Sequence, residues 1–370
     1  MQKSFNIAVV AGDGIGPEVC ESAIQVLKAC KNPDCELAFQ YHKGGAKVFL
    51  ETGTALPDAT LEQCLGSDAV LHGAAGLPDV NFPDGTEAGQ DFSMKMRSTL
   101  DLYANIRPVR SFPGVPSPLQ SPMGRIIDYI IVRENTEGLY AARSGGNIIR
   151  NEVATDTMIF TRFGIERICH KAAELALSRN GAPADGVKRI TIVDKANVLR
   201  GYAFFRKVAL EVFAGYKELE VECILIDAVT ADMLQRPEHF DIIVTENMFG
   251  DIISDLAAAT VGGLGIAPSA EIGDQHGYFQ GIHGSAPTLT GKNLANPIAT
   301  ILSAAEMLSW LGGKHNIPSL LADATRISDS VAQILAEAQH VTADLGGTAS
   351  TTDCTNAIIQ KMNNTVVQPA

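Results

Sequence analysis

The sequence predicts an α/β protein in which a largely parallel sheet is covered by helices on both faces. Short apolar runs alternate along the chain with longer segments of helical periodicity. The runs are apolar on nearly every residue, which is typical of strands that are buried on both faces. With 370 residues, of which 46% are hydrophobic, the chain can bury the core of one large or two ordinary domains.

The limits of these elements follow from the lengths of the apolar runs and from the periodicity between them. The predicted strands include Ile7–Ala11, Ala69–Leu71, Ile126–Val132, Arg189–Val193, Val221–Ile226 and Asp241–Val244. The predicted helices include Thr161–Ser178, Leu199–Ala214 and a helix-rich tail from about Pro297 to Met362.

The charge and the cysteines restrict the class of function. The chain has 29 Lys and Arg against 42 Asp and Glu, a net charge of −13. This balance argues against a nucleic-acid-binding scaffold, although it is compatible with a local basic pocket for an acidic substrate. The seven cysteines have no zinc-binding spacing, and no apolar run is long enough for a transmembrane helix. We therefore expect a cytoplasmic protein with no membrane or nucleic-acid partner.

Polar residues follow four of the predicted strands at the point where each strand ends. They include Arg133 to Tyr140, Asp194 to Asn197, Asp227, and Thr245 to Asp251. Ligand sites in open α/β sheets lie beyond the carboxyl ends of the strands. Each cluster alone fits a plain loop, but four clusters at equivalent places predict one cleft.

The segment Gly12–Pro17 follows the first predicted strand and opens a helix. It lacks the third glycine of a dinucleotide-binding fingerprint, because Val19 holds that position. A tight turn with Pro17 in the first helical turn is the favoured interpretation, and ligand contact is the alternative.

Asp251 and Asp255 are the strongest candidates for a metal site. If a helix begins near Gly250, these two residues lie four positions apart on one face. Adjacent carboxylates suit a hard divalent cation such as Mg²⁺ or Mn²⁺. The alternative is that Asp251 caps the helix while Asp255 is solvated.

Three arginines, a lysine and a tyrosine each have two interpretations. Arg97, Arg107 and Arg133 either clamp a dicarboxylic acid through bidentate hydrogen bonds or form surface salt bridges. Lys195 directly follows an apolar strand, where it needs a carboxylate partner or a lowered pKa. Tyr140 is either a proton donor or a packing residue.

The loop His283–Pro287 is rich in small residues and is followed by Asn293–Pro297 and a helix. Small residues allow a flat ring to approach the backbone, so His283 could stack on an adenine. A plain turn with a solvated histidine is the alternative.

Taken together, these motifs resemble the metal-dependent β-decarboxylating dehydrogenases, which act on isocitrate, 3-isopropylmalate, homoisocitrate and tartrate or D-malate. The similarity runs from Gly12–Pro17 to the helix after Pro297, with the segment 247–265 as its most specific part. It implies a two-lobe fold with a parallel or mixed sheet flanked by helices and without a Rossmann-type cofactor domain. A large cofactor-binding lobe would comprise residues 1–103 and 262–370. A small lobe of residues 104–261 would carry the dimer interface and an arm at about residues 141–157.

The resemblance also implies a reaction, the NAD-dependent oxidative decarboxylation of a 3-substituted malate by a homodimer with shared active sites. The three arginines Arg97, Arg107 and Arg133 match the residues that hold the substrate carboxylates. Asp251 and Asp255, with Asp227 from the second subunit, match the ligands of Mg²⁺ or Mn²⁺. Lys195, also from the second subunit, would be the base for the hydroxyl proton, and Tyr140 would protonate the enolate.

For the cofactor, the resemblance implies NAD, although NADP stays open. The residues that match the adenosine side are Ile15, His283, Gly284, Ser285, Ala286, Pro287, Thr288 and Asn296. Asn197 would contact the nicotinamide side. Thr288 departs from the family, where NAD-dependent members usually have Asp and many NADP-dependent members have Lys at this position.

The group at C3 of the substrate would face Ser93 and Met94, where isopropylmalate enzymes have a Leu-Leu pair. Asp91, if it points inward, would discourage a third carboxylate. The first substrate to test is 3-isopropylmalate; tartrate/D-malate, homoisocitrate and isocitrate are alternatives. A catalytically silent regulatory subunit is less favoured, because Tyr140, Lys195 and the metal-ligand aspartates are all present.

Overall fold

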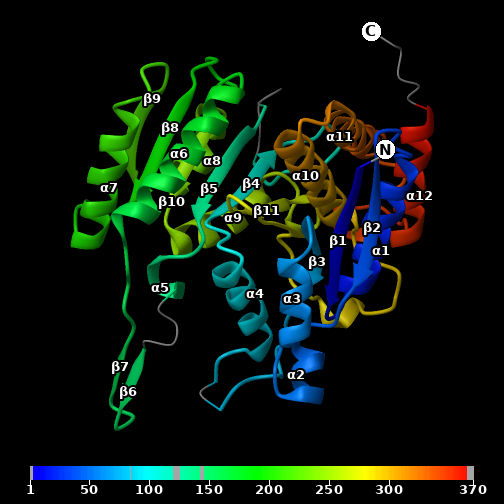
Figure 1. Ribbon diagram of the computed structural model, residues 1–370. Helices are drawn as coiled ribbons and strands as arrows, with labels where there is room; N and C mark the ends of the chain where they lie inside the picture. Colours follow the sequence, from blue (N-terminus) through cyan, green and yellow to red (C-terminus); the bar gives the residue numbers. More distant parts are fainter. Residues whose placement is uncertain (1–2, 84, 120–125, 142–145, 365–370) are drawn as a thin grey trace.

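The central feature of the computed structural model is one ten-stranded sheet that crosses the whole molecule (Figure 1). The structure describes residues 3–83, 85–119, 126–141 and 146–364. The first five strands in sheet order are β2 (Cys35–Tyr41), β1 (Lys3–Gly12), β3 (Ala69–Ala74), β12 (Gly277–Gly281) and β11 (Pro268–Ile272). The other five are β4 (Ala104–Arg110), β5 (Asp128–Glu134), β10 (Ile242–Thr245), β8 (Arg189–Asp194) and β9 (Glu220–Leu225).

The sheet is mixed and mostly parallel, which confirms the α/β class and the expected parallel or mixed sheet. At its centre, β11 runs antiparallel to both β12 and β4, and β4 runs antiparallel to β5. The remaining neighbours pair in parallel. The central strands were not predicted because polar residues interrupt their apolar pattern, as Asn105 and Arg107 do in β4.

Helices cover both faces of the sheet, as the apolar strands predict. Alternate residues of β5 point to opposite sides. Ile130 and Val132 belong to the cluster that includes residues of the long helix α6, whereas Tyr129 and Ile131 pack with residues of α8 and α9. The helices on this half of the sheet are α6 (Arg162–Ser178), α7 (Arg200–Phe213), α8 (Ile226–Gln235) and α9 (Asn247–Thr260).

The other half of the sheet carries the helices of both chain ends. Here α10 packs against β11, β12 and the N-terminal helix α1, while α12 packs against α1 and α11. These helices are α1 (Gly16–Ala29), α10 (Ile298–His315), α11 (Pro318–Glu337) and α12 (Thr351–Asn364). The predicted helix-rich tail is therefore confirmed.

The remaining elements are short. They are the helices α2 (Ala46–Thr52), α3 (Asp58–Leu65), α4 (Ala88–Thr99) and α5 (Gly138–Ala141), the strands β6 (Asn147–Ile149) and β7 (Val153–Thr155), and the 3₁₀ turns Pro237–His239, Leu264–Ile266, Pro287–Leu289 and Ala343–Leu345. The β6–β7 hairpin extends away from the body of the molecule (Figure 1). It lies within the segment where the sequence predicts an arm; residues 142–145 of that segment are outside the described part.

The Gly12–Pro17 segment forms the tight turn that its sequence favours. Gly12 and Gly14 have φ values of 75° and 58°, which suit glycine. A Cβ atom at Gly12 would lie 1.9 Å from the carbonyl oxygen of Ala74. Beyond the turn, the backbone N–H of Ile15 donates to the carbonyl oxygen of Ser285 at 2.8 Å. The turn thus holds the His283–Pro287 loop against the start of α1.

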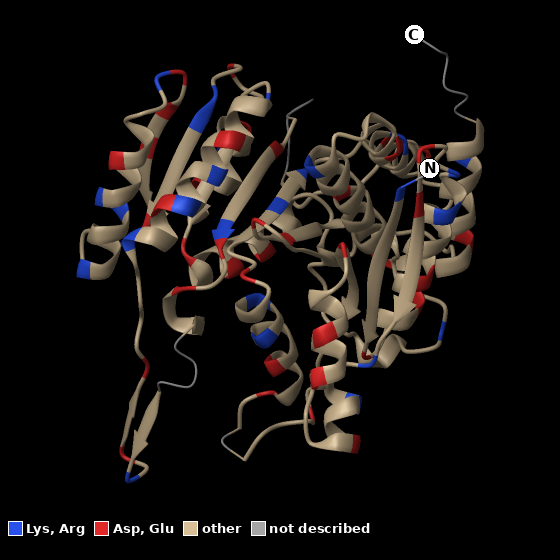
Figure 2. Cartoon of the chain, in the orientation of Figure 1, with Lys and Arg blue, Asp and Glu red and all other residues tan. Residues whose placement is uncertain are grey.

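Charged side chains of both signs are scattered over the two halves of the molecule (Figure 2). Among the described residues, no helix is both long and apolar enough to cross a membrane.

Candidate active site

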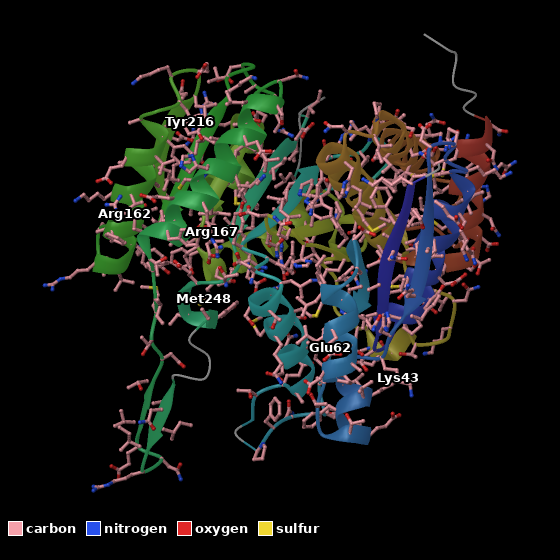
Figure 3. All side chains as sticks on the ribbon, viewed as in Figure 1. Lys43, Glu62, Arg162, Arg167, Tyr216 and Met248 are labelled. Atoms are coloured by element: carbon pink, nitrogen blue, oxygen red, sulfur yellow. The ribbon has the colours of Figure 1, made fainter. Side chains whose placement is uncertain are left out.

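A cleft of about 770 Å³ lies where α4, β4, β5, α5, α9 and the loop after β12 meet. Met248 at the start of α9 lines it and is marked in Figure 3. The predicted site residues that line it are Ser93, Met94, Arg97, Arg107, Arg133, Tyr140, Asp251, His283 and Gly284. The structure therefore brings residues from these six elements to one place. Of the four polar clusters predicted to share a cleft, those at Arg133 to Tyr140 and Thr245 to Asp251 line it, whereas Asp194 to Asn197 and Asp227 do not.

The three arginines are buried, which rules out the interpretation that they form ordinary surface salt bridges. Arg97, Arg107 and Arg133 have exposed fractions of 7%, 5% and 1%. Arg107 on β4 is paired with Ile131, and Arg133 on the neighbouring β5 is paired with Asn105, so the two arginines are diagonal neighbours, and both reach Asp251. Burial, together with the positive charges of Arg107 and Arg97, lowers the pKa of Arg133 to about 9. The cluster thus carries positive charge that calls for an anion.

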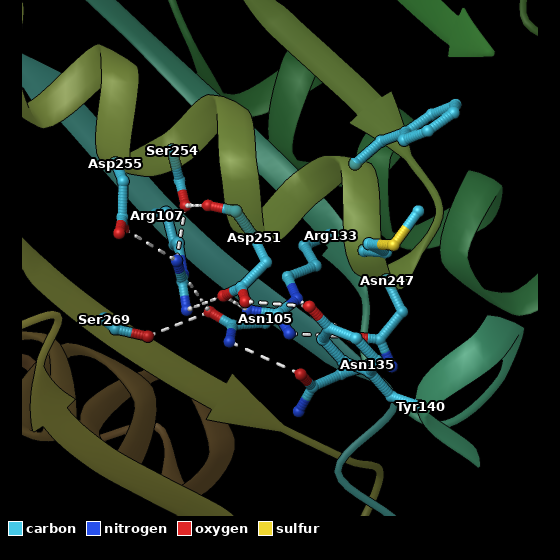
Figure 4. Close-up of polar contacts among 12 residues, drawn as sticks. Asn105, Arg107, Arg133, Asn135, Tyr140, Asn247, Asp251, Ser254, Asp255 and Ser269 are labelled. Atoms are coloured by element: carbon cyan, nitrogen blue, oxygen red, sulfur yellow. Dashed lines mark hydrogen bonds and ion pairs between the residues drawn. The ribbon is translucent and has the colours of Figure 1, made fainter. Parts of the chain in front are cut away.

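Asp251 is the acidic partner of two of these arginines (Figure 4). It forms an ion pair with Arg133, and its Oδ1 lies 3.5 Å from Nη2 of Arg107. Arg133 is held from the other side by Asn247, whose Oδ1 accepts from Nε at 3.0 Å and from Nη2 at 2.7 Å. Burial raises the pKa of Asp251, but the arginines outweigh it and leave the net shift downward.

The helix that carries Asp251 begins earlier than the sequence suggests. It starts at Asn247, and the side chain of Glu246 caps it by accepting from the backbone N–H groups of Met248 and Phe249. Asp251 is therefore not the cap, but the second part of that alternative holds, because the Asp255 side chain is 58% exposed. Asp255, one turn later, lies 3.9 Å from Arg107, so both aspartates face the same arginine.

Two carboxylates on one helix face suit an oxygen-ligated divalent cation. Among residues 3–83, 85–119, 126–141 and 146–364, however, no group of three His, Cys, Asp or Glu side chains is placed to hold a metal ion. Asp251 and Asp255 therefore have no third His, Cys, Asp or Glu beside them among these residues.

Tyr140 lies beside the same ion pair. Its hydroxyl donates to Oδ2 of Asp251 at 3.3 Å, and the guanidinium of Arg133 lies 5.8 Å from the centre of its ring. Burial raises the pKa of Tyr140, and the charge of Asp251 raises it further. The phenol therefore stays protonated at neutral pH and can act as a proton donor.

Lys195, Asn197 and Asp227 do not line the cleft of their own chain. Lys195 follows β8 and forms an ion pair with Asp227 at the start of α8. The Lys195 side chain is 28% exposed and that of Asp227 is 64% exposed. Asn197 is exposed as well. The sequence correctly predicts a carboxylate partner for the lysine, but the pair stands apart from Asp251.

The predicted adenosine-binding residues gather around the loop after β12. Ser285 and Ile15 are joined by the backbone hydrogen bond described above, and Nε2 of His283 lies 3.3 Å from Oγ1 of Thr300. Ala286 has a left-handed φ of 38°, and Pro287 begins the short turn that contains the exposed Thr288.

Asn296 follows this loop in the chain and lies two residues before the start of α10 at Ile298. Its Nδ2 donates to Oδ2 of Asp344 at 2.9 Å. Thr342 donates to the other oxygen of the same carboxylate at 2.5 Å. Asp344 thus places a negative charge beside Asn296, and no feature of the sequence singles it out.

The sequence pattern of the isocitrate/isopropylmalate dehydrogenase family matches residues 6–358. The chain belongs to this family. It is 41% identical over 357 residues to the 3-isopropylmalate/3-methylmalate dehydrogenase of Methanocaldococcus jannaschii, covering 96% of this chain and 98% of the relative. It is 39% identical over 377 residues to the 3-isopropylmalate dehydrogenase of Heyndrickxia coagulans, covering 99% and 98%.

Solved structures of family members agree with the fold. The isocitrate dehydrogenase of Methylococcus capsulatus superposes with a TM-score of 0.84 at 32% identity, covering 97% of this chain and 99% of that one. The β-decarboxylating dehydrogenase of Thermococcus kodakarensis, in its apo form, gives a TM-score of 0.76 at 38% identity, covering 97% and 96%. The protein is thus a dehydrogenase of the family that its motifs resemble.

Two features of this dehydrogenase's cleft differ from what the sequence suggests. Glu271 lies behind the cleft and binds Arg97, a pairing that the motifs do not indicate. The signal for it was a charged residue inside a buried strand, which needs a partner. Asp91 does not line the main cleft; it forms an ion pair with Lys95 at 2.7 Å on the same helix and lines an adjoining pocket with Met94, Arg97 and Tyr140.

Proposed function

We propose that this dehydrogenase oxidatively decarboxylates a 3-substituted malate with NAD, and that 3-isopropylmalate is its substrate. The observation that carries the proposal is the buried contact of Arg107 and Arg133 with Asp251 in a cleft that Tyr140 also lines. This cleft combines carboxylate-binding groups, a metal-ligand candidate and a proton donor. The relatives at 39% and 41% identity named for 3-isopropylmalate support the choice of substrate.

The carboxylates of the substrate would be bound by the buried guanidinium groups. Arg107 and Arg133 are held by neighbouring strands, so their donors are fixed before a ligand arrives. Bidentate hydrogen bonds from arginine match the planar geometry of a carboxylate. Ser93 and Met94 line the cleft from α4, where Met94 offers an apolar contact for an alkyl group at C3.

Asp251 and Asp255 fit Mg²⁺ or Mn²⁺, since both are oxygen ligands that face one direction. A bound divalent cation would supply a Lewis acid that lowers the pKa of the 2-hydroxyl and stabilises negative charge on the ketone oxygen. We propose that Asp227 of the partner subunit completes this set, because one chain does not.

A homodimer with shared active sites explains why Lys195 and Asp227 stand apart from the cleft of their own chain. Exposed apolar side chains lie on the two helices that carry the aspartates: Leu234 on α8 is 44% exposed and Ile252 on α9 is 58% exposed. Ile148 in the β6–β7 hairpin is 63% exposed. A subunit interface over α8, α9 and the hairpin would bury these side chains. The two-lobe division into residues 1–103 with 262–370 and residues 104–261 is part of this proposal.

The proton transfers would be carried out by side chains of both subunits. Lys195 of the partner subunit would accept the proton of the 2-hydroxyl while hydride leaves C2 for the nicotinamide of NAD. After loss of CO₂ from the β-keto acid, Tyr140 would donate its proton to C3 of the enolate. The raised pKa of Tyr140 keeps that proton available.

The cofactor would occupy the side of the cleft formed by Ile15, the His283–Thr288 loop and Asn296, with Asn197 toward the nicotinamide. We favour NAD because Thr288 supplies no positive charge for a 2′-phosphate and Asp344, beside Asn296, supplies a negative one. We place the enzyme in the cytoplasm, where its free cysteines would stay reduced.

A substrate panel tests this proposal. The purified enzyme is assayed at saturating Mn²⁺ with 3-isopropylmalate, D-malate, tartrate, homoisocitrate and isocitrate, each with NAD and with NADP. We expect the highest kcat/KM with 3-isopropylmalate and NAD. No turnover of any member would refute the enzyme, and preference for another member would refute the choice of substrate.

A further inference from the structure

The turn that carries Lys195 is built on a buried aspartate. Asp194 ends β8 and is fully buried. Its Oδ1 accepts from the backbone N–H of Ala196 at 2.8 Å. The carbonyl oxygen of Lys195 accepts in turn from the N–H groups of Val198 and Leu199, at 3.1 and 3.2 Å. These three hydrogen bonds fix the backbone on both sides of Lys195.

Arg206 on α7 supplies the countercharge of Asp194. Its Nε donates to Oδ2 of Asp194 at 2.7 Å, and its Nη2 donates to Oδ1 at 2.7 Å. Two parallel hydrogen bonds of this kind hold the carboxylate in one orientation. A buried carboxylate needs such a partner. Because Arg206 meets this need, the next residue along the chain, Lys195, is left to pair with Asp227.

We propose that Arg206 is a positioning residue, which through Asp194 fixes the turn that presents Lys195 to the cleft of the partner subunit. The inference rests on the proposed function, since Lys195 is the base in that function. It deepens the function by adding a residue that does not line the cleft and that no motif singles out.

The pairing of β8 with β9 explains why this turn needs a separate support. Asp194 is opposite Leu225, the last residue of β9. Lys195 and Asp227 therefore leave the sheet at the same edge. Strand pairing ends there, however, and does not set the direction of the side chains that follow. The ammonium of a lysine is carried on a flexible four-carbon stem, so its backbone must be fixed if it is to reach one point.

The first test replaces the arginine. Kinetic constants with 3-isopropylmalate, NAD and Mn²⁺ are measured for the wild type, Lys195→Met and Arg206→Met. A misplaced base slows the chemical step, so we expect Arg206→Met to lower kcat at least about tenfold and to leave KM within about threefold. Arg206→Lys keeps the charge but cannot form two parallel bonds, so it should also lower kcat. This milder variant serves if Arg206→Met does not fold.

Mixed dimers show in which cleft Arg206 acts. Arg206→Met mixed with Asp251→Asn should reach about a quarter of wild-type activity, because the cleft with intact Asp251 then receives a correctly held Lys195. Arg206→Met mixed with Lys195→Met should stay at the mean of the two variants, because neither chain supplies that lysine in place. Any other pattern after verified subunit exchange would overturn the proposal. Recovery with Lys195→Met alone, for example, would place the effect of Arg206 in the cleft of its own chain.

Arg179→Met is the matched control. Arg179 also pairs with a fully buried aspartate, because its Nε donates to Oδ1 of Asp241 at 2.7 Å. This pair lies at the opposite end of the strands, just before β10 begins. Loss of either arginine should lower the melting temperature, since each leaves a buried carboxylate unpaired. Only Arg206→Met should lower kcat, and Arg179→Met should stay within about threefold of the wild type, because no reacting group depends on it. A tenfold loss of kcat in the control would overturn the proposal.

Two outcomes separate this inference from the proposed function. If Lys195→Met is inactive while a folded Arg206 variant has wild-type kcat, the positioning role fails and the proposed base stands. If Lys195→Met is active, the proposed base fails. Hydrogen exchange across residues 194–199, measured by mass spectrometry, then tests the positioning by itself. These amides should exchange at least about tenfold faster in Arg206→Met than in the wild type and Arg179→Met, and unchanged exchange would overturn the proposal.

Discussion

Arg133 and Asp251 form an ion pair on the floor of the cleft, between β5 and α9. The pair joins a residue proposed to bind substrate with a residue proposed to bind metal. Without a bound metal or substrate, each residue neutralises the charge of the other. Binding of a cation and a dicarboxylate would exchange this contact for two others without leaving either charge uncompensated, which is the condition for keeping charges in a buried site.

Asp251→Asn should abolish the response to metal. The amide keeps the shape but loses the negative charge that a divalent cation requires. We expect kcat at saturating Mn²⁺ to fall at least about 100-fold and the Mn²⁺ concentration for half-maximal activity to rise. Asp329→Asn, at an exposed position on α11, is the control and should leave both unchanged. Wild-type Mn²⁺ dependence in Asp251→Asn would remove Asp251 from the metal site.

Lys195→Met and Asp251→Asn should each be inactive alone, yet active when mixed. In a mixed dimer, the cleft with intact Asp251 receives Lys195 of the partner subunit, while the other cleft has neither group. Random subunit exchange should therefore restore about a quarter of wild-type activity. Each variant mixed with itself is the control. No recovery after verified exchange would show that both residues act in the same chain.

Tyr140→Phe should slow protonation of the enolate while leaving the fold intact. Loss of one proton donor typically costs 10²-fold or more, so we expect kcat to fall by about that factor with KM nearly unchanged. Because the pKa of Tyr140 is raised by burial, wild-type activity should not decline through its ionisation below about pH 10. Tyr41→Phe, at a side chain that is 59% exposed, should behave like the wild type.

Gly250→Ala should displace the side chain of Arg133. A Cβ atom at Gly250 would lie 2.6 Å from Cγ of Arg133, which is fully buried and cannot move freely. We expect a lower melting temperature and a KM for substrate raised about tenfold. Gly313→Ala in α10, where a Cβ would meet nothing within 4 Å, should instead raise stability by about 0.5–1 kcal/mol. A Gly250→Ala enzyme with normal KM would show that Arg133 does not bind the substrate.

Glu271 should make stability depend on acid pH. Its pKa is about 2 in the folded chain instead of 4.5, so its contribution is full above pH 4.5 and is lost as the pH falls toward 2. Between about pH 6 and pH 3, the difference in unfolding free energy between the wild type and Glu271→Gln should shrink by about 2 kcal/mol. Urea denaturation at several pH values measures this difference. A constant difference would mean that the carboxylate is not held ionised by Arg97.

The sequence by itself determined the α/β class, most of the parallel strands and the helices of the C-terminal part. These follow from hydrophobic periodicity, which acts over a few neighbouring residues. The same local rule placed Asp251 and Asp255 on one helix face. The order of the motifs, with the signature around Asn247, also indicates the family and the three arginines of the cleft.

Only the tertiary structure decided how distant segments meet. The antiparallel positions of β4 and β11, the cap at Glu246 and the pair of Arg97 with Glu271 depend on packing between segments far apart in the chain. So does the separation of Lys195 and Asp227 from the cleft. Hydrophobic periodicity indicates which residues are buried, but it does not indicate which residues they contact. Strand order and buried ion pairs are chosen by the free energy of the whole core, and that choice leaves no mark on the local sequence.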